Sequence, residues 1–84
     1  AMLTIVIWDN DPQRIAEIDR NLQAAAVELG LKVLTLSNAE PPSIARENLA
    51  GRLPVLEIGG RYWSRRPGQA FSRAECLSLL SKFV

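Results

Sequence analysis

The sequence predicts a single α/β domain with the element order β-α-β-α-β-β-α, in which helices flank a four-stranded mixed sheet. Three observations support this prediction. An apolar run over residues 3–8 is followed at once by a helix-start signal, as in the first half of a βαβ unit. A Gly-Gly pair separates two short apolar runs and predicts a β-hairpin. A capping box close to the C-terminal end predicts a last helix.

Composition points to one small globular unit. The chain has 84 residues, of which 48% are hydrophobic, which is enough for a core and too many for a disordered chain. We expect one domain over residues 1–84, in which Ala1 before Met2 looks like the remnant of an expression tag. No apolar run approaches the roughly 20 residues that span a bilayer, and no signal peptide is evident. We therefore expect a cytoplasmic protein without membrane association.

The first strand and helix have the clearest signals. Residues 3–8 include a β-branched run and predict a strand buried on both faces of a sheet. Asp11 can cap the free amides of a helix, and Pro12 suits its first position, where a missing N–H costs nothing. Gly30 is a natural stop for this helix. Its inner face is predicted from three- and four-residue spacing: Ile15, Ile18, Leu22, Ala25, Ala26 and Leu29.

The middle of the chain predicts a parallel strand and a short helix. Residues 31–37 are expected to form a strand parallel to the first, because the link between the two runs through a helix. A loop with two consecutive prolines follows. Residues 43–50 then predict a short helix with Ile44, Ala45 and Leu49 turned inward.

The last third predicts a hairpin and a helix. Residues 55–58 and 61–64 form the expected hairpin, and side-chain alternation puts Tyr62 and Trp63 on opposite faces of it. The sequence from Ser72 is a capping box, so the last helix is expected to begin near residue 73.

The inventory of reactive side chains is small. The chain has one cysteine, Cys76, and no histidine, so it lacks an intramolecular disulfide, the commonest general base and the commonest transition-metal ligand. We therefore expect no metal and no cofactor. Cys76 is expected to be a small buried hydrophobe of the last helix, and the alternative is an exposed thiol that forms an intermolecular disulfide. Asp9 and Asp11 are expected to serve as turn and cap residues, with paired acid and base carboxylates as the alternative.

The element order resembles that of the thioredoxin-like superfamily, and the chain is most similar to its small glutaredoxin-like and minimal thioredoxin members. The resemblance covers residues 3–83 and implies a redox Cys-x-x-Cys motif directly after the first strand. That window reads Pro12-Gln13-Arg14-Ile15, so both cysteine positions are lost, to Pro12 and to Ile15. The family's cis-proline at the start of the third strand is matched by Leu53-Pro54-Val55. The glutathione-binding Gly-Gly-x-Asp is absent, so glutathione binding is not implied.

Loss of both cysteines predicts a redox-inactive protein, because thiol–disulfide exchange needs a thiolate. The family's fold also offers a groove between the loop that opens the first helix and the proline loop. Our leading hypothesis is therefore a protein- or peptide-binding module that uses this groove. The candidate groove residues are Trp8, Asp9, Asp11, Arg52, Leu53, Pro54, Trp63 and Arg65.

Charge suggests an alternative. Residues 1–42 carry six acidic and three basic side chains, a net charge of −3, whereas residues 43–84 carry three acidic and seven basic ones, a net charge of +4. Most of that basic charge is arginine, which suits oriented contacts with carboxylate or phosphate. The alternative is thus a small anionic-ligand binder or enzyme that uses Arg52, Arg61, Arg65 and Arg66. A pI near 8.2 argues against nucleic-acid binding, and the oligomeric state is left open.

Overall fold

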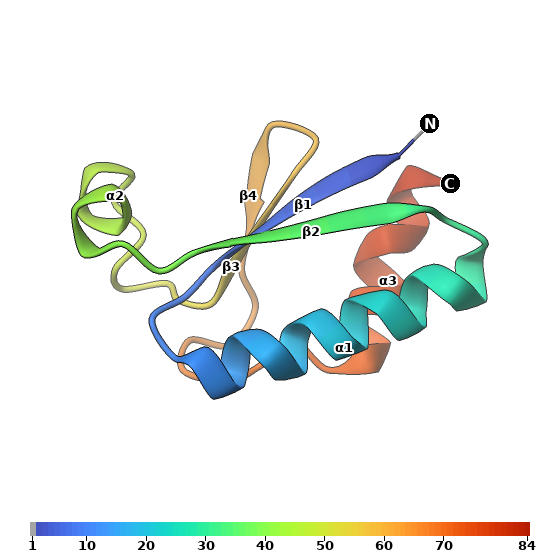
Figure 1. Ribbon diagram of the computed structural model, residues 1–84, viewed down its shortest axis with the longest axis horizontal. Coiled ribbons are helices and arrows are strands. Elements are labelled where there is room, and N and C mark those ends of the chain that lie inside the picture. The colour runs from blue at the N-terminus through green and yellow to red at the C-terminus, as the bar shows by residue number, and fades with distance from the viewer. Residues whose placement is uncertain (1) are drawn as a thin grey trace.

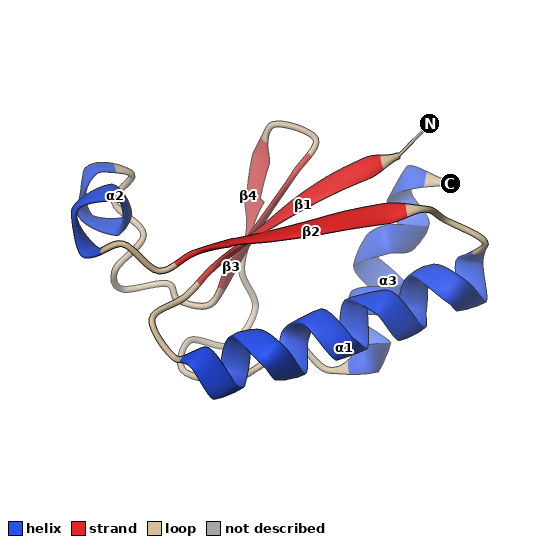
Figure 2. Cartoon of the chain, in the orientation of Figure 1, coloured by secondary structure: helices blue, strands red, loops and turns tan. Residues whose placement is uncertain are grey.

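The computed structural model of the protein describes residues 2–84, and its elements follow the predicted order (Figure 1). Three helices and a four-stranded mixed sheet make up this part of the chain (Figure 2). Ala1, the expected tag remnant, lies outside the described residues. The elements are β1 (Leu3–Trp8), α1 (Pro12–Leu29), β2 (Val33–Asn38), α2 (Pro41–Arg46), β3 (Val55–Ile58), β4 (Arg61–Trp63), α3 (Arg73–Leu80) and a closing 3₁₀ turn, η1 (Ser81–Phe83).

The strands lie in the order β2-β1-β3-β4. β1 and β2 are parallel, as the helical link predicted, and β3 and β4 form the predicted antiparallel hairpin. β3 also runs antiparallel to β1, with Trp8 opposite Val55. This register brings the loop after β1 and the segment before β3 to the same end of the sheet.

The signals at both ends of α1 are confirmed. The Asp11 carboxylate accepts hydrogen bonds from the backbone N–H groups of Gln13, at 3.0 Å, and Arg14, at 3.3 Å. Pro12 occupies the first turn, and Gly30 ends the helix in the left-handed conformation with φ of 68°. Local sequence therefore fixes where this helix starts and stops.

β2 begins two residues later than predicted. The N–H of Leu31 donates to the carbonyl of Ala26 at 2.9 Å, which satisfies a carbonyl at the end of α1. Leu31 therefore belongs to the helix terminus, and the strand runs over Val33–Asn38.

α2 covers Pro41–Arg46, and the prediction of a helix over residues 43–50 is wrong at both ends. The two prolines form the first helical turn, where no amide needs an intrahelical partner. Asn48, with φ of 60°, then turns the chain out of the helix. Leu49 is fully buried beyond the helix end, whereas Ala45, predicted to point inward, is exposed.

α3 starts at Arg73, as the capping box predicted. The Glu75 N–H donates to the Ser72 hydroxyl at 3.1 Å, and the Ser72 N–H donates to the Glu75 carboxylate at 2.9 Å. Both contacts satisfy amides that the first helical turn leaves open.

The sheet has one fully covered face. α1 and α3 lie on the same side of it, and the main core fills the space between (Figure 1). A smaller second core lies on the other face next to α2. Its buried members are Trp8, Ile44, Leu49, Leu53 and Val55.

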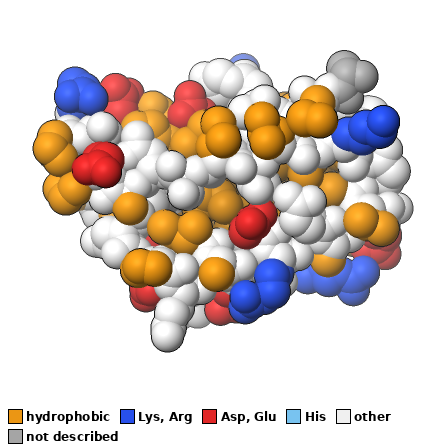
Figure 3. All heavy atoms as spheres, in the orientation of Figure 1, with side chains coloured by type: hydrophobic (Ala, Val, Ile, Leu, Met, Phe, Trp, Pro, Cys, Tyr) orange, Lys and Arg blue, Asp and Glu red, His pale blue; other side chains and the backbone are white. Residues whose placement is uncertain are grey.

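The prediction that the first strand is buried on both faces is wrong. Thr4 is exposed and Val6 is half-buried, because α2 covers only one end of the second face. Leu34 and Leu36 of the edge strand β2 are about half exposed beside them, at 45% and 50%. In Figure 3 hydrophobic side chains accordingly gather on the side of the molecule where β1 and β2 lie.

Candidate functional site

A buried ion pair occupies the point where β1 passes into α1. The Asp9 side chain is fully buried, and its two oxygens each accept a hydrogen bond of 2.6 Å from the Arg14 guanidinium. One of these oxygens also accepts the N–H of Asn10 at 2.8 Å. The hydrogen bond that Arg14 donates to Asp9 raises the pKa of the Arg14 guanidinium above its usual value. Asp9 is therefore fully engaged in holding this turn, as a turn residue was expected to be, and Asp11 serves as the helix cap.

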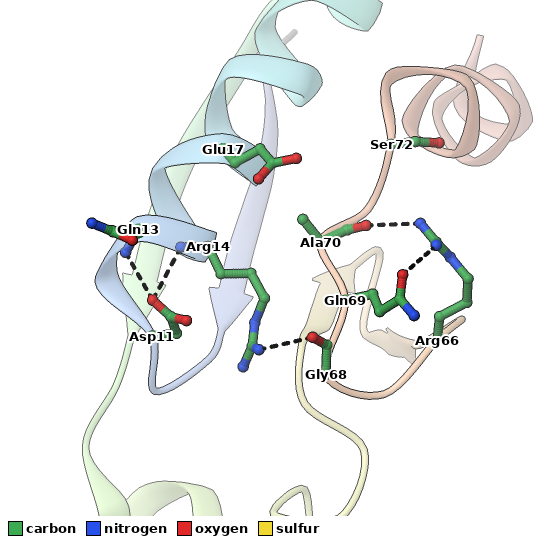
Figure 4. A pocket seen from close by; sticks show the side chains of 9 residues that line it. All are labelled: Asp11, Gln13, Arg14, Glu17, Arg66, Gly68, Gln69, Ala70 and Ser72. Atoms are coloured by element: carbon green, nitrogen blue, oxygen red, sulfur yellow. Dashed lines mark hydrogen bonds between the residues drawn. The ribbon is translucent and has the colours of Figure 1, made fainter.

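The same arginine ties α1 to the far side of the fold. The remaining guanidinium nitrogen of Arg14, Nη1, donates to the carbonyl of Gly68 at 3.1 Å (Figure 4). The Gly68 N–H in turn donates to the carbonyl of Leu53 at 2.8 Å. These bonds join the start of α1, the loop after β4 and the segment before Pro54. The Arg14 side chain thus reaches from the start of α1 to the loop after β4, whereas a depression of about 180 Å³ opens next to α2, between Asn10 and Leu53.

Most of the other predicted groove residues point into the protein. The Trp8 ring is 7% exposed, donates from Nε1 to the Glu57 carboxylate at 2.9 Å, and packs edge-on against Tyr62. Leu53 is also 7% exposed, and Pro54, which follows it across a cis peptide bond as the resemblance implies, is buried. Trp8 and Pro54 therefore pack in the interior, and the small exposed part of Leu53 lines the depression next to α2.

The two positions where the resemblance implies cysteines, Pro12 and Ile15, lie on another side of α1. Pro12 is exposed and Ile15 is half-buried, and both line a shallow depression of about 160 Å³ against β2. No sulfur atom is available there, because neither side chain contains one.

A polar cleft of about 450 Å³ opens between the start of α1 and the loop before α3, and we call it the α1 cleft. Figure 4 shows its lining. Two arginines line it, but both are held by carboxylates: Arg14 by Asp9, and Arg66 by Glu75 at 2.8 Å. The Arg66 contact lowers the pKa of Glu75 to about 2. Since Glu17 also lines this cleft, it offers little net positive charge to an anion.

A smaller pocket of about 210 Å³ lies between the end of β4 and α3, and we call it the β4 pocket. Its inner wall is apolar, since Phe71 and Leu79 are buried there beside the half-buried Trp63. The exposed Arg65 and Lys82 line its mouth. The complete lining is Trp63, Ser64, Arg65, Phe71, Leu79 and Lys82.

A third cation approaches this mouth. Arg52 donates from Nε and Nη2 to the hydroxyl of Ser64, at 3.3 Å and 3.2 Å. Within residues 2–84, no carboxylate lies at ion-pair distance from Arg52, Arg65 or Lys82. The β4 pocket therefore combines an apolar interior with a basic rim, which distinguishes it from the larger α1 cleft.

The structure thus brings together only part of the predicted groove. Arg52, Trp63 and Arg65 meet at the β4 pocket. Of the five other candidate residues, Asp9 and Asp11 lie at the start of α1. Trp8 and Leu53 lie in the second core, and Pro54 is buried directly before β3. Sequence reasoning missed Phe71, Leu79 and Lys82, which line the same pocket. Leu79 lies in α3 and Lys82 in the 3₁₀ turn η1 that follows it, and no short-range pattern in the sequence links either of them to Trp63.

Cys76 is the buried hydrophobe that the sequence predicted. Its side chain is fully buried in α3, and burial raises the pKa of its thiol to about 12. The alternative of an exposed thiol is therefore wrong. Since the chain has no other cysteine, it presents no thiolate at neutral pH.

Two further features bear on the function. Residues 2–84 contain no group of three or more His, Cys, Asp or Glu side chains arranged to hold a metal ion. None of the helices in this part of the chain combines the length and the hydropathy that crossing a bilayer requires.

No protein-family model and no curated protein sequence matches the chain.

Proposed function

We propose that this chain is a redox-inactive, thioredoxin-like domain that binds an extended segment of a partner protein at the β4 pocket. One observation carries the proposal: an apolar pocket with a basic rim lies directly beside an edge strand of the sheet. Edge strands and adjacent side-chain pockets together form a recurring mode of peptide recognition.

Three features support the thioredoxin-like part of the proposal. The elements follow the order that the resemblance implies, and the last two strands are antiparallel. Pro54 directly precedes β3. Because Trp8 pairs with Val55, Pro54 lies at the end of the sheet where α1 begins.

The loss of redox activity follows from chemistry. The residues at the start of α1 that would carry the two sulfurs are Pro12 and Ile15, and neither can act as a nucleophile. Cys76 is buried in α3, where its raised pKa keeps it a thiol. A thiol with a pKa of about 12 contributes almost no thiolate at pH 7.

The size of the β4 pocket favours one side chain over a whole small-molecule ligand. Sites for small molecules and cofactors usually enclose about 300–1,000 Å³, whereas this pocket holds about 210 Å³. β4 pairs with β3 alone among residues 2–84, so its outer edge can hydrogen-bond to an added strand. Trp63 and the two arginines near the pocket, Arg52 and Arg65, match the residue types enriched at protein interfaces.

The alternative, binding of a small anion, has weaker support. The α1 cleft is larger, but an anion there would compete with Asp9 for Arg14 and with Glu75 for Arg66. Of the four arginines in that hypothesis, Arg65 and Arg66 line different pockets and so cannot close on one ligand.

Selection from a displayed random-peptide library tests the proposal. We expect enriched peptides that bind the wild-type chain and lose binding to Trp63→Ala. Tyr62→Ala is the matched control, because Tyr62 is a half-buried aromatic of the same strand on the opposite sheet face. Failure to enrich any sequence above scrambled peptides, or equal loss with both variants, would remove the support for this site.

A disulfide-reduction assay tests the redox part separately. With dithiothreitol as electron donor and insulin as substrate, we expect the chain to leave the uncatalysed rate unchanged. Turnover above that background, lost in Cys76→Ala, would refute redox inactivity.

A further inference from the structure

We infer that the partner segment is an acidic peptide that inserts one large apolar side chain into the β4 pocket, with carboxylates two positions before and after it. This inference rests on the proposed peptide binding and adds the chemistry of the partner. It is argued from the pocket interior, the charges around it and the geometry of β4.

The pocket interior is already organised for an apolar group. Trp63 donates from Nε1 to the carbonyl of Ile58 at 3.3 Å and packs edge-on against Phe83, with 6.3 Å between ring centroids. These two contacts hold the ring in place, and the same ring lines the pocket. Phe71, at 2% exposed, and Leu79, at 5%, close the interior. A side chain that enters meets walls that need little ordering, and this lowers the entropic cost of binding.

The rim selects negative charge. Arg65 and Lys82 lie at the mouth, and Arg52 reaches it through the Ser64 hydroxyl. Arg61 is exposed two residues before Trp63 and so faces the same side of β4.

Acidic side chains near this strand are engaged elsewhere. Glu57 of β3 faces the opposite side of the sheet, where it accepts the hydrogen bond from Trp8. Glu75 of α3 is held by Arg66. A basic segment would therefore meet repulsion around the whole mouth, whereas an acidic one would meet attraction.

Strand geometry sets the spacing of the carboxylates. In a peptide added to β4, alternate side chains face the pocket side of the sheet. With about 3.3 Å per residue, positions two apart lie about 6.6 Å from the inserted group. That distance separates an acidic side chain from the apolar one and carries it out of the pocket to the basic rim. The expected pattern is acidic, any residue, large apolar, any residue, acidic.

Fluorescence anisotropy with synthetic peptides tests this inference. The probe carries one phenylalanine with glutamate two positions away on each side and threonine elsewhere. Comparison peptides replace both glutamates by lysine, or the phenylalanine by alanine. We expect the lysine and the alanine peptides to bind at least about tenfold more weakly than the probe at low salt, since several modest ion pairs and one buried side chain are lost. Raising the ionic strength should weaken binding of the probe.

Charge reversal identifies the surface. We expect Arg65→Glu with Lys82→Glu to lower affinity for the glutamate probe about tenfold and to raise affinity for the lysine peptide. The matched control is Arg20→Glu with Lys32→Glu, which changes net charge equally at exposed positions outside the pocket lining. This control should retain most of the affinity for the probe. Thermal melts of both double variants verify that they are folded.

The outcomes are distinguishable. Equal binding of the glutamate and lysine peptides, or equal loss in both double variants, overturns the acidic-partner inference while peptide binding stands. Equal binding of the alanine peptide overturns the pocket as the apolar site. Absence of binding by every peptide counts against the proposed function itself. Concentration-dependent dimerisation that Arg65→Glu with Lys82→Glu abolishes would identify a second copy of the chain as the occupant and overturn the inference.

Discussion

Removal of the Arg14 guanidinium should strongly destabilise the fold, because it leaves the Asp9 carboxylate buried without its counter-charge. In Arg14→Met the apolar stem is kept, and four hydrogen bonds are lost, two to Asp9, one to the Gly68 carbonyl and a long one to the Asn10 side chain. Breaking a buried ion pair costs about 3–5 kcal/mol. Since 19% of the Arg14 side chain is exposed while Asp9 is fully buried, water can partly replace the arginine. We therefore expect a loss at the lower end, about 3 kcal/mol.

That loss is large for a domain of this size. Small domains are stable by about 5–15 kcal/mol in total. With about 4–8 °C of melting temperature per kcal/mol in a domain of 60–100 residues, the variant should melt about 12–24 °C lower. Urea unfolding followed by tryptophan fluorescence gives the free energy, and calorimetry gives the melting temperature.

A double-mutant cycle isolates the ion pair. Asp9→Asn should cost about 2 kcal/mol on its own, because the amide cannot accept all three donors that surround it. The double variant Asp9→Asn with Arg14→Met should lose less than the sum of the single variants, since it buries no lone charge. A cost of less than about 1 kcal/mol for Arg14→Met, which is the value of an exposed ion pair, would refute the reasoning about the Asp9–Arg14 pair. Simple addition of the two single effects in the double variant would refute it as well.

Three further predictions concern α3 and the hairpin. The Cys76 thiol, with its pKa raised to about 12, should react with a thiol reagent at pH 8 only as fast as the chain unfolds; immediate labelling of the native chain would contradict its burial. Glu75 has a folded pKa lowered to about 2, so its contribution is present above its ordinary pKa of 4.5 and is lost as the pH falls from there towards 2. Glu75→Gln should therefore lower stability by about 1 kcal/mol at pH 7, because glutamine loses the charge that pairs with Arg66 while its amide can still accept the Ser72 N–H. The deficit should shrink as acid unfolding is followed downward, and a deficit independent of pH would refute this. Gly59 and Gly60 both have positive φ, but only an added Cβ at Gly59 would meet the Phe83 ring, at 3.0 Å. Chemical denaturation should thus show that Gly60→Ala lowers the free energy of unfolding by about 1 kcal/mol and that Gly59→Ala lowers it clearly more. Equal losses would mean that the Phe83 ring moves aside freely.

Local chemistry accounts for the features that could be predicted. Asp11, Gly30 and Ser72 act within a few residues of themselves, so the helix boundaries they set are readable from sequence. The burial of Cys76 was predicted on a different ground, because free cysteine is among the most buried residue types. The limits of α2 were not, because Leu49 is buried by packing against Trp8 and the second core and not by continuing the helix.

The candidate site depended on contacts between distant parts of the chain. Arg14 looks like an ordinary exposed helix residue in sequence, yet its bonds to Asp9 and to the Gly68 carbonyl tie the start of α1 to the loop after β4. Trp8 and Trp63 were assigned to one surface, but β1 and β4 turn them to opposite faces of the sheet.

The sequence by itself therefore determined the order of the elements, the helix caps and the absence of a reactive sulfur, because each depends on residue type and near neighbours. Only the tertiary structure decided which side chains share a surface. Strand order and register set the distances between Arg52, Trp63, Phe71, Leu79 and Lys82, and no short-range pattern encodes them. The apolar pocket with its basic rim exists because packing α3 against the end of β4 brings these separate segments together.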